Sequence, residues 1–340
     1  MEIDLVYITD RSQGIHRRKQ GKGFAYYNAK GELIRNQEKL HRIRQLKIPP
    51  IWKDVWICDQ PRGHLQAVGQ DLKGRKQYLY HHEWNHYRNQ SKFHKISEFA
   101  RCLPEIREKA FEDVNQPGWP REKVLGLLVI TMDELHIRVG NEQYKKRNQT
   151  FGLTTLRRRH LHFEKDRIKL EYKAKSGKYR KINIKNNQLV NLIRQLSELP
   201  GYEIFRYRDK GKTIPVDSQD VNEYLKTISH EKFTSKDFRT WGGTVTAIEV
   251  LPEALKEVKE NKRKKLTTTL IRTVASRLGN TVSICRDYYI HPAVLQKVEE
   301  HKIRKLTPEP FEPDQFGLTP AEETALVLIE KYEKNKEIEF

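Results

Sequence analysis

The chain of 340 residues is long enough for two domains, and 36% of its residues are hydrophobic, which allows each domain a packed core. It carries 65 lysines and arginines against 45 aspartates and glutamates, and the net charge of +20 favours a polyanionic partner, most commonly nucleic acid, over the alternative of a basic ribosomal protein. No apolar stretch is long enough to span a membrane, which excludes a membrane protein. The start MEIDLVYITD lacks a signal-peptide pattern and the cysteines number only three, so a secreted disulfide scaffold is excluded and a cytoplasmic protein is predicted. Because the cysteines form no CxxC pair, no zinc site is predicted.

Residues 1–92 are rich in glycine, aromatic residues and short apolar runs. GFAYYNAKGELI predicts two strands around an Asn-Ala-Lys-Gly turn, and DVWICDQPRGHLQAVGQDLKGRKQYLYH predicts further strands with glycine and proline at the turns. One short helix is predicted near NQEKLHRIRQLK. The segment therefore predicts a small, mainly β N-terminal domain.

The periodicity becomes helical from about Phe93, in ISEFARCLPEIREKAFEDV. A longer helix is predicted in PREKVLGLLVITMDELHIRVG, opening at Pro120 and ending near Arg138. Strands are predicted in FGLTTL, HLHFE and RIKLEYKAKSGKYRKINI; in the last of these, apolar side chains alternate with charged ones and Lys175 sits at a hairpin tip.

Residues from about 187 onward predict mostly helices, followed by the proline-rich break LTPEPFEPDQFGLTP. A last helix, AEETALVLIEKYEK, is predicted to begin from Thr319 with Glu322 in capping-box spacing. The expected fold class is α+β, with a β-rich domain at 1–92 that binds DNA. A larger, mostly α-helical catalytic domain with a three-stranded sheet insert follows at 93–340, in which 307–340 form a C-terminal linker and helix.

Two arginines, a lysine, an asparagine and a tyrosine stand out in the larger domain: Arg138, Lys175, Arg239, Asn280 and Tyr289. Taken singly, each has an ordinary structural explanation, such as an arginine at a helix end or a packed tyrosine. Together they suit attack on a phosphodiester, because guanidinium groups hold the phosphate charge, a phenol is a nucleophile once deprotonated, and an ammonium can protonate a leaving oxygen.

The sequence resembles the poxvirus-like and bacterial type IB DNA topoisomerases over roughly residues 5 to 300. The motifs IPPIWKDVWIC, GHLQAVGQDLKGRKQYLYH, IRVGNEQY, FGLTTLR, KDFRTWGGT and LGNTVSICRDYYIHP occur in the order of that family. The resemblance implies a catalytic domain of the tyrosine recombinase type. It also implies relaxation of supercoiled duplex DNA through a 3′-phosphotyrosyl nick, strand swivelling and religation, without ATP or metal.

Matched motif by motif, the resemblance makes Tyr289 the nucleophile, with Tyr288 beside it. Arg138 and Arg239 become the phosphate-holding arginines, and Lys175 becomes the hairpin acid. Asn280 stands where viral and eukaryotic relatives have a histidine. The resemblance also implies DNA contacts by Lys236 and by residues of GRKQYLY, namely Arg75, Lys76, Gln77, Tyr78 and Tyr80.

Two rival functions remain open from the sequence. A tyrosine recombinase would share the catalytic residues, but its second arginine usually follows a His-x-x-Arg pattern, whereas Lys236-Asp237-Phe238-Arg239 stands here. A non-catalytic DNA-binding protein would not need the set of arginines, lysine and tyrosine. No acidic cluster suited to two metal ions is evident in the sequence, so a reaction without metal is predicted. The expected protein is a monomer that acts on double-stranded DNA and is associated with the nucleoid.

Overall fold

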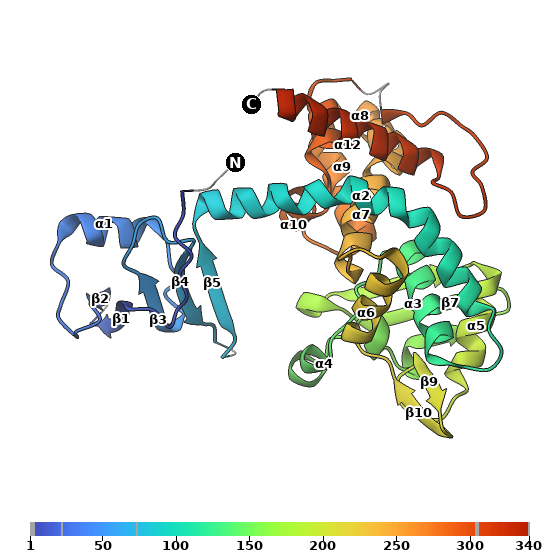
Figure 1. Cartoon of the computed structure of the whole chain (residues 1–340). Coiled ribbons are helices and arrows are strands. Elements are labelled where there is room, and N and C mark those ends of the chain that lie inside the picture. Colours follow the sequence, from blue (N-terminus) through green and yellow to red (C-terminus); the bar gives the residue numbers. More distant parts are fainter. Residues whose placement is uncertain (1–3, 22, 73, 303–305, 339–340) are drawn as a thin grey trace. The chain divides into compact units, whose positions relative to one another are not determined.

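The computed structural model describes residues 4–338 apart from 22, 73 and 303–305, and the chain forms two compact units, Met1–Lys92 and Phe93–Phe340 (Figure 1). The first contains a five-stranded antiparallel sheet, and the second is mostly helical with a three-stranded sheet and a two-stranded hairpin. The predicted α+β class is therefore confirmed.

The sheet of the first unit has the strand order β2-β1-β3-β4-β5. Its strands are β1 (Gly14–Gln20), β2 (Gly23–Tyr27), β3 (Lys53–Cys58), β4 (Leu65–Gln70) and β5 (Lys76–Tyr80). Successive side chains of a strand point to opposite faces, so Val55 and Ile57 join one buried cluster while Trp56 and Cys58 join another. Helix α1 (Gln37–Gln45) contributes Ile43 to the first cluster, which places the helix on that face.

The first predicted hairpin is only half right. Gly23–Tyr27 is a strand, but its partner is β1, and the chain beyond the turn makes only an isolated bridge from Leu33 to Tyr27. The Asn28 side chain accepts hydrogen bonds from the amides of Lys30 and Glu32, at 3.0 and 2.9 Å. These side-chain bonds close the turn locally, so the following residues do not need a full ladder.

The connecting helix α2 (His82–Val114) begins well before Phe93. Its first three turns, HEWNHYRNQSK, lack the apolar 3.6-residue repeat on which the prediction depended. Helix α3 (Arg121–Leu135) starts after Pro120 and buries the predicted face, including Val124 and Leu128. It ends at His136, whose left-handed φ of 49° stops the helix, so Arg138 lies in the loop beyond and not in the helix as predicted.

The three-stranded sheet consists of β6 (Leu161–Phe163), β7 (Ile168–Lys173) and β8 (Tyr179–Ile184). The predicted alternation is confirmed, since Ile168, Leu170, Tyr172 and Ala174 are buried. The strand predicted in FGLTTL is wrong, because Leu153–Thr155 form a 3₁₀ turn. Its amides bind the loop after α3, from Leu153 N to Arg138 O at 2.8 Å and from Thr154 N to Val139 O at 2.7 Å.

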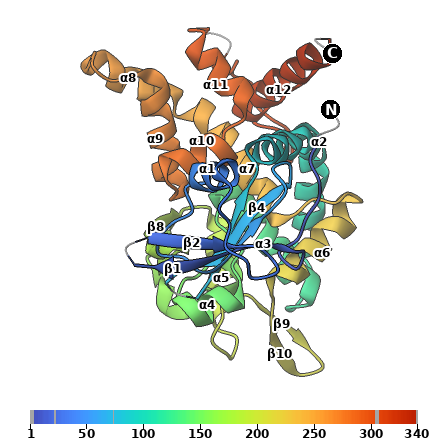
Figure 2. The ribbon, with the colours of Figure 1, turned by 90° about the vertical axis from the view of Figure 1, so that its left-hand side faces the viewer.

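The remaining elements of the second unit surround one large core. They are α4 (Glu142–Asn148), α5 (Asn187–Ser197), β9 (Arg206–Asp209), β10 (Lys212–Pro215), α6 (Ser218–Ser229), α7 (Ser235–Glu249), α8 (Leu251–Glu260), α9 (Leu266–Leu278), α10 (Val282–Tyr288), α11 (Pro292–Glu299) and α12 (Pro320–Ile338). Within this unit, α8, α9 and α12 lie at one end and the unpredicted β9–β10 hairpin at the other (Figures 1 and 2). Among the described helices, none is both long and apolar enough to cross a membrane.

The predicted capping box of the last helix is confirmed. Thr319 N donates to Glu322 Oε2 at 2.8 Å, and Glu322 N donates to Thr319 Oγ1 at 3.3 Å. Glu322 also accepts from Trp241 Nε1 at 3.0 Å and from Arg107 Nη2 at 2.7 Å. Since Trp241 belongs to α7, this bond joins α12 to the helix that also contains Arg239.

Candidate active site

Arg138 and Asn280 meet although they lie in different elements. The guanidinium of Arg138 donates from Nη2 to Asn280 Oδ1. Asn280 follows α9, which ends at Gly279 with a left-handed φ of 63°, and its amide closes the turn on Ala275 O at 2.8 Å. Asn280 is 9% exposed; its buried Nδ2 has no hydrogen bond of ordinary geometry among the described residues, and its side chain lies against the Cys285 thiol. That group is therefore a hydrogen-bond donor available to an incoming acceptor.

Arg239 lies in the second turn of α7 and is 4% exposed. It donates from Nη1 to His136 O and from Nη2 to Leu278 O at 3.0 Å, which fixes the plane of the guanidinium. These two carbonyls lie at the ends of α3 and α9, so one side chain joins three helices. Burial, followed by the nearby charge of Arg138, lowers the pKa of Arg239 to about 10. The group remains cationic at neutral pH.

Tyr289 is the residue directly after α10 and is half-buried against Arg239, whose Cζ lies 5.1 Å from the centre of the phenol ring. Burial raises the pKa of Tyr289, but the charges of Arg239 and Arg138 and their hydrogen bonds outweigh it, so its pKa falls below the ordinary value. A lowered pKa makes the phenolate, the nucleophilic form, more accessible. The structure thus brings Arg138, Arg239, Asn280 and Tyr289 together.

A glycine pair that the sequence analysis did not use explains how Tyr289 reaches this position. A Cβ on Gly243 would lie 2.6 Å from Tyr289 O and 2.7 Å from its Cβ, and one on Gly242 would lie 2.3 Å from the His136 ring. Thr244 Oγ1 then donates to Tyr289 O at 3.2 Å and accepts from His291 N at 3.1 Å. In the sequence the pair is part of the motif WGGT, which begins two residues after Arg239, but the motif alone does not show that it packs on Tyr289.

Replacement of Gly243 by alanine is expected to push the Tyr289 backbone away from Arg239. A misplacement of about 1 Å costs roughly 100-fold in rate, so Gly243→Ala should slow DNA cleavage by about that factor. DNA affinity, measured by filter binding, should stay near that of the unmodified protein. Gly23→Ala is the matched control, since its added carbon would meet nothing closer than 3.9 Å. Equal cleavage rates for Gly243→Ala and the unmodified protein would contradict this packing.

Two predicted site residues are not brought into this cluster. Lys175 lies in the 3₁₀ turn Lys175–Gly177 at the tip of the β7–β8 hairpin, where it is exposed. Within the described part of the chain, it makes no hydrogen bond or ion pair with the clustered residues. Lys236 lies in the first turn of α7, one turn before Arg239, and is also exposed. Both side chains are accessible to an extended ligand.

The candidate DNA-contacting residues of the first unit lie on or next to the edge strand β5. Tyr78 and Tyr80 stack with ring centres 6.1 Å apart, and Lys76 Nζ lies 5.7 Å from the Tyr78 ring centre. Gln77 points to the other face and donates to Asp71 Oδ2 at 3.1 Å, and Arg75 also pairs with Asp71, at 2.6 Å. The predicted set is therefore divided between two faces, with the aromatic residues and Lys76 on one of them.

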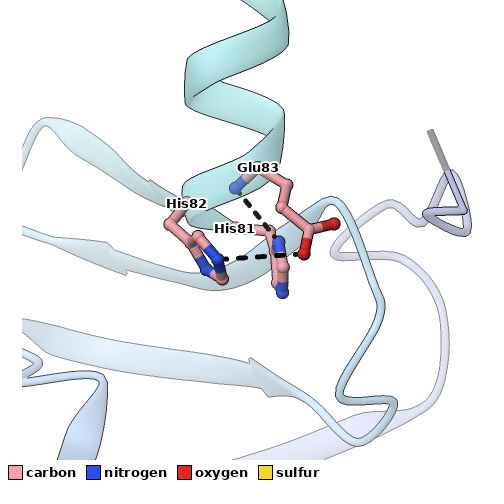
Figure 3. Close-up of side chains that lie close together, drawn as sticks. All are labelled: His81, His82 and Glu83. Atoms are coloured by element: carbon pink, nitrogen blue, oxygen red, sulfur yellow. Dashed lines mark hydrogen bonds and ion pairs between the residues drawn. The ribbon is translucent and has the colours of Figure 1, made fainter. Parts of the chain in front are cut away.

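Among the residues that the structure describes, one group of side chains has the spacing of metal ligands, although the sequence predicted no metal site. His81, His82 and Glu83 at the start of α2 offer ligand atoms within 4.8 Å of one another (Figure 3). His81 Nδ1 already accepts from Glu83 N at 3.3 Å, and Arg62 pairs with the Glu83 carboxylate at 3.5 Å. Arg62 already neutralises the one carboxylate of this group, and one nitrogen of His81 is already hydrogen-bonded. Both features oppose metal binding, so no catalytic step is assigned to this group.

Two histidines, the half-buried His136 and the buried His160, make the stability of the protein depend on pH. Burial, followed by neighbouring arginines, lowers the pKa of His136 and of His160 to about 4. The unfolded chain takes up these protons near pH 6.5, so stability should be full above about pH 6.5 and fall towards pH 4.

The expected loss is about 1.4 kcal/mol per pH unit for each histidine. Urea unfolding at several pH values measures it, and His136→Gln should show a shallower dependence than the unmodified protein. Parallel curves for the two proteins would contradict a neutral His136 in the folded protein.

The family comparisons cover most of the chain. Residues 75–310 match the model of the eukaryotic DNA topoisomerase I catalytic core, and residues 23–71 match the model of the bacterial DNA topoisomerase IB N-terminal domain. All five residues of the candidate catalytic set lie within the first match.

Individual relatives agree with these models. DNA topoisomerase 1B of Acanthamoeba polyphaga mimivirus is 30% identical over 286 residues, which are 82% of this chain and 85% of the relative. DNA topoisomerase I of Monkeypox virus is 24% identical over 83% of this chain and 89% of its own length. A structure of the XerH site-specific recombinase on a palindromic difH substrate matches 59% of this chain and 50% of its own at 15% identity, and its TM-score of 0.37 is too low to support an argument.

Proposed function

The chain belongs to the type IB DNA topoisomerase family, and from this premise we propose that Tyr289 is the nucleophile that nicks one strand of duplex DNA and later reseals it. The observation that carries this proposal is the meeting of the Tyr289 phenol with two guanidinium groups from separate parts of the chain. Type IB DNA topoisomerase activity itself follows from the family.

In the proposed step, the Tyr289 oxygen forms a bond to phosphorus while the bond from phosphorus to the 5′ oxygen breaks. The phenol proton leaves to water, which is easier because the pKa of Tyr289 is lowered. Arg138, Arg239 and the buried Nδ2 of Asn280 would hold the two non-bridging oxygens as their charge grows. Because Asn280 does not titrate, this donor would keep its role at every pH.

The departing 5′ oxygen needs a proton, and we assign its delivery to Lys175. Its exposed position at a hairpin tip allows the ammonium to reach a strand that the core residues cannot cover. The product is a 3′-phosphotyrosyl bond with a free 5′ hydroxyl. The free end swivels, and its attack on phosphorus restores the strand, so the bond energy is conserved and no ATP is required.

The remaining predictions belong to the same proposal. Residues 1–92 would grip the duplex through Lys76, Tyr78 and Tyr80, with Arg75 and Gln77 beside them, while Lys236 would contact a phosphate near the nick. The net charge of +20 supports contacts that are mostly to phosphates. We infer a monomer that needs no metal or cofactor, because one chain contains every group that the proposed step uses. We also infer that it is cytoplasmic and associated with the nucleoid, where its DNA substrate lies.

Relaxation of supercoiled plasmid tests the proposal directly. The unmodified protein is expected to produce fully relaxed circles in EDTA and without nucleotide. Addition of Mg²⁺ or ATP should not be required, and raised salt should weaken binding. Activity that appears only with a divalent metal or a nucleotide would contradict the proposed chemistry, even though the family assignment would stand.

A further inference from the structure

The β7–β8 hairpin is attached to the end of α9 by two cations that the proposed chemistry does not use. Lys178 Nζ donates to the main-chain oxygen of Asn280 at 2.6 Å. Arg180 Nη1 donates to Arg277 O at 2.7 Å and to Ser276 O at 3.4 Å. Lys178 is the first residue after the turn that holds Lys175, so the attachment lies at the base of the hairpin tip.

The end of α9 is suited to this contact. The last carbonyl groups of a helix lack partners within the helix, and the helix dipole places partial negative charge there. Arg180 of β8 donates to two of these oxygens, Ser276 O and Arg277 O, while Lys178, directly before β8, binds the main-chain oxygen of Asn280 in the turn that follows α9. Gly279 makes the approach possible, because a Cβ at this position would lie 2.5 Å from Arg180 Cδ and Nη1. Its φ of 63° independently favours glycine, so the same residue ends the helix and admits the hairpin.

The attached turn is also the one that carries the reacting groups. Asn280 presents its side chain to Arg138 while its main-chain oxygen binds Lys178. Helix α10 begins directly afterwards, at Val282, and leads to Tyr289. The turn at Asn280 therefore contacts Arg138 through its side chain, contacts the hairpin through its main-chain oxygen, and leads into the helix before Tyr289. Lys175 itself makes no hydrogen bond to this turn within the described residues.

We propose that Lys178, assisted by Arg180, is a positioning residue that docks the hairpin onto the end of α9 and so places Lys175 at the leaving 5′ oxygen. This inference rests on the proposed role of Lys175 as the proton donor. Lys178 itself donates to a main-chain carbonyl, and among the described residues it makes no hydrogen bond to Arg138, Arg239 or Tyr289.

A sulfur substitution separates positioning of the acid from other defects. A duplex with a mapped cleavage site is prepared with either oxygen or sulfur at the scissile 5′ position, and single-turnover cleavage is measured. A thiolate leaves without a proton because thiols ionise near pH 8.5. Lys175→Met should slow the oxygen substrate by roughly 10²- to 10⁴-fold and leave the sulfur substrate almost unaffected.

For the inference itself, Lys178→Met should slow the oxygen substrate by about 10- to 100-fold and the sulfur substrate by only a few-fold, since the misplaced group is the acid. Lys178→Arg should restore most of the rate, because a guanidinium also reaches the carbonyl. Lys181→Met is the matched control, since Lys181 lies three residues further along, in β8, is exposed, and pairs with Glu171 at 3.4 Å.

Three results would overturn the inference. Equal slowing of both substrates by Lys178→Met would mean a general disturbance of the site, and unchanged rates would mean that the contact has no role. A loss as deep as that of Lys175→Met, without recovery in Lys178→Arg, would make Lys178 the acid. If the sulfur substrate does not restore the cleavage rate of Lys175→Met, then Lys175 is not the proton donor. This measurement therefore tests the role of Lys175 separately from the role of Lys178.

Discussion

Tyr289→Phe is expected to abolish both plasmid relaxation and covalent capture of DNA. The variant removes one oxygen atom, the one that would bond to phosphorus, and keeps the ring that packs beside Arg239. A second phenol, Tyr172, lies near Arg239 and Arg138, but it is hydrogen-bonded to Arg180 and burial raises its pKa, so it does not replace the Tyr289 oxygen. Relaxation should fall below detection, while DNA affinity in filter binding should change by no more than a few-fold.

The adjacent tyrosine is the matched control. Tyr288 is the last residue of α10 and is 37% exposed, whereas Tyr289 is half-buried on Arg239. Tyr288→Phe should therefore relax plasmid at close to the normal rate and still yield an adduct when the reaction is stopped with SDS. Loss of activity in Tyr288→Phe with activity kept in Tyr289→Phe would move the nucleophile by one residue.

Arg239→Lys is expected to reduce the cleavage rate by roughly 10²- to 10³-fold, the usual effect of losing a preorganised donor to a developing oxyanion. The guanidinium holds two carbonyls, His136 O and Leu278 O, and still faces the Tyr289 ring. An ammonium is a point charge without the planar fork, so it cannot keep both anchors and address a phosphate. Single-turnover cleavage measures the effect.

The same substitution should also raise the pKa of Tyr289, because the shorter ammonium keeps a charge but loses the hydrogen bond by which the Arg239 guanidinium lowers that pKa. The pH at which cleavage reaches its plateau should then move upward. Arg101→Lys is the control, since Arg101 forms an exposed ion pair with Glu330 at 2.6 Å. A normal rate with an unshifted pH profile in Arg239→Lys would show that this guanidinium does not act on the reacting phosphate.

The sequence predicted elements where apolar periodicity was strong. The face of α3, the alternation in β7 and the capping box at Thr319 were all foreseeable, because each pattern is local. The predictions failed where long-range bonds decide the conformation. FGLTT forms a turn because its amides bind the loop after α3. The β9–β10 hairpin is a different failure: it is local, and the glycine of its Lys210-Gly211 turn, where both residues have positive φ, was not used as a turn signal.

For the site, motifs predicted which residue types were needed but not how they are held. Arg138, Arg239, Asn280 and Tyr289 were named from the sequence, and the structure brings them together. The roles of His136, Gly243 and Lys178 depend on contacts across many residues, so no local pattern announced them. Lys175 could be named from its motif, yet its attachment through Lys178 became visible only in three dimensions.

The central claim is that one phosphorus atom becomes bonded to the oxygen of Tyr289. The reaction is stopped with SDS, the adduct is digested with protease and nuclease, and the nucleotide-bearing peptide is sequenced by mass spectrometry. The predicted result is a nucleotide on Tyr289, attached through its 3′ phosphate. A nucleotide on another residue, attachment through a 5′ phosphate, or relaxation with no adduct at all would contradict the account.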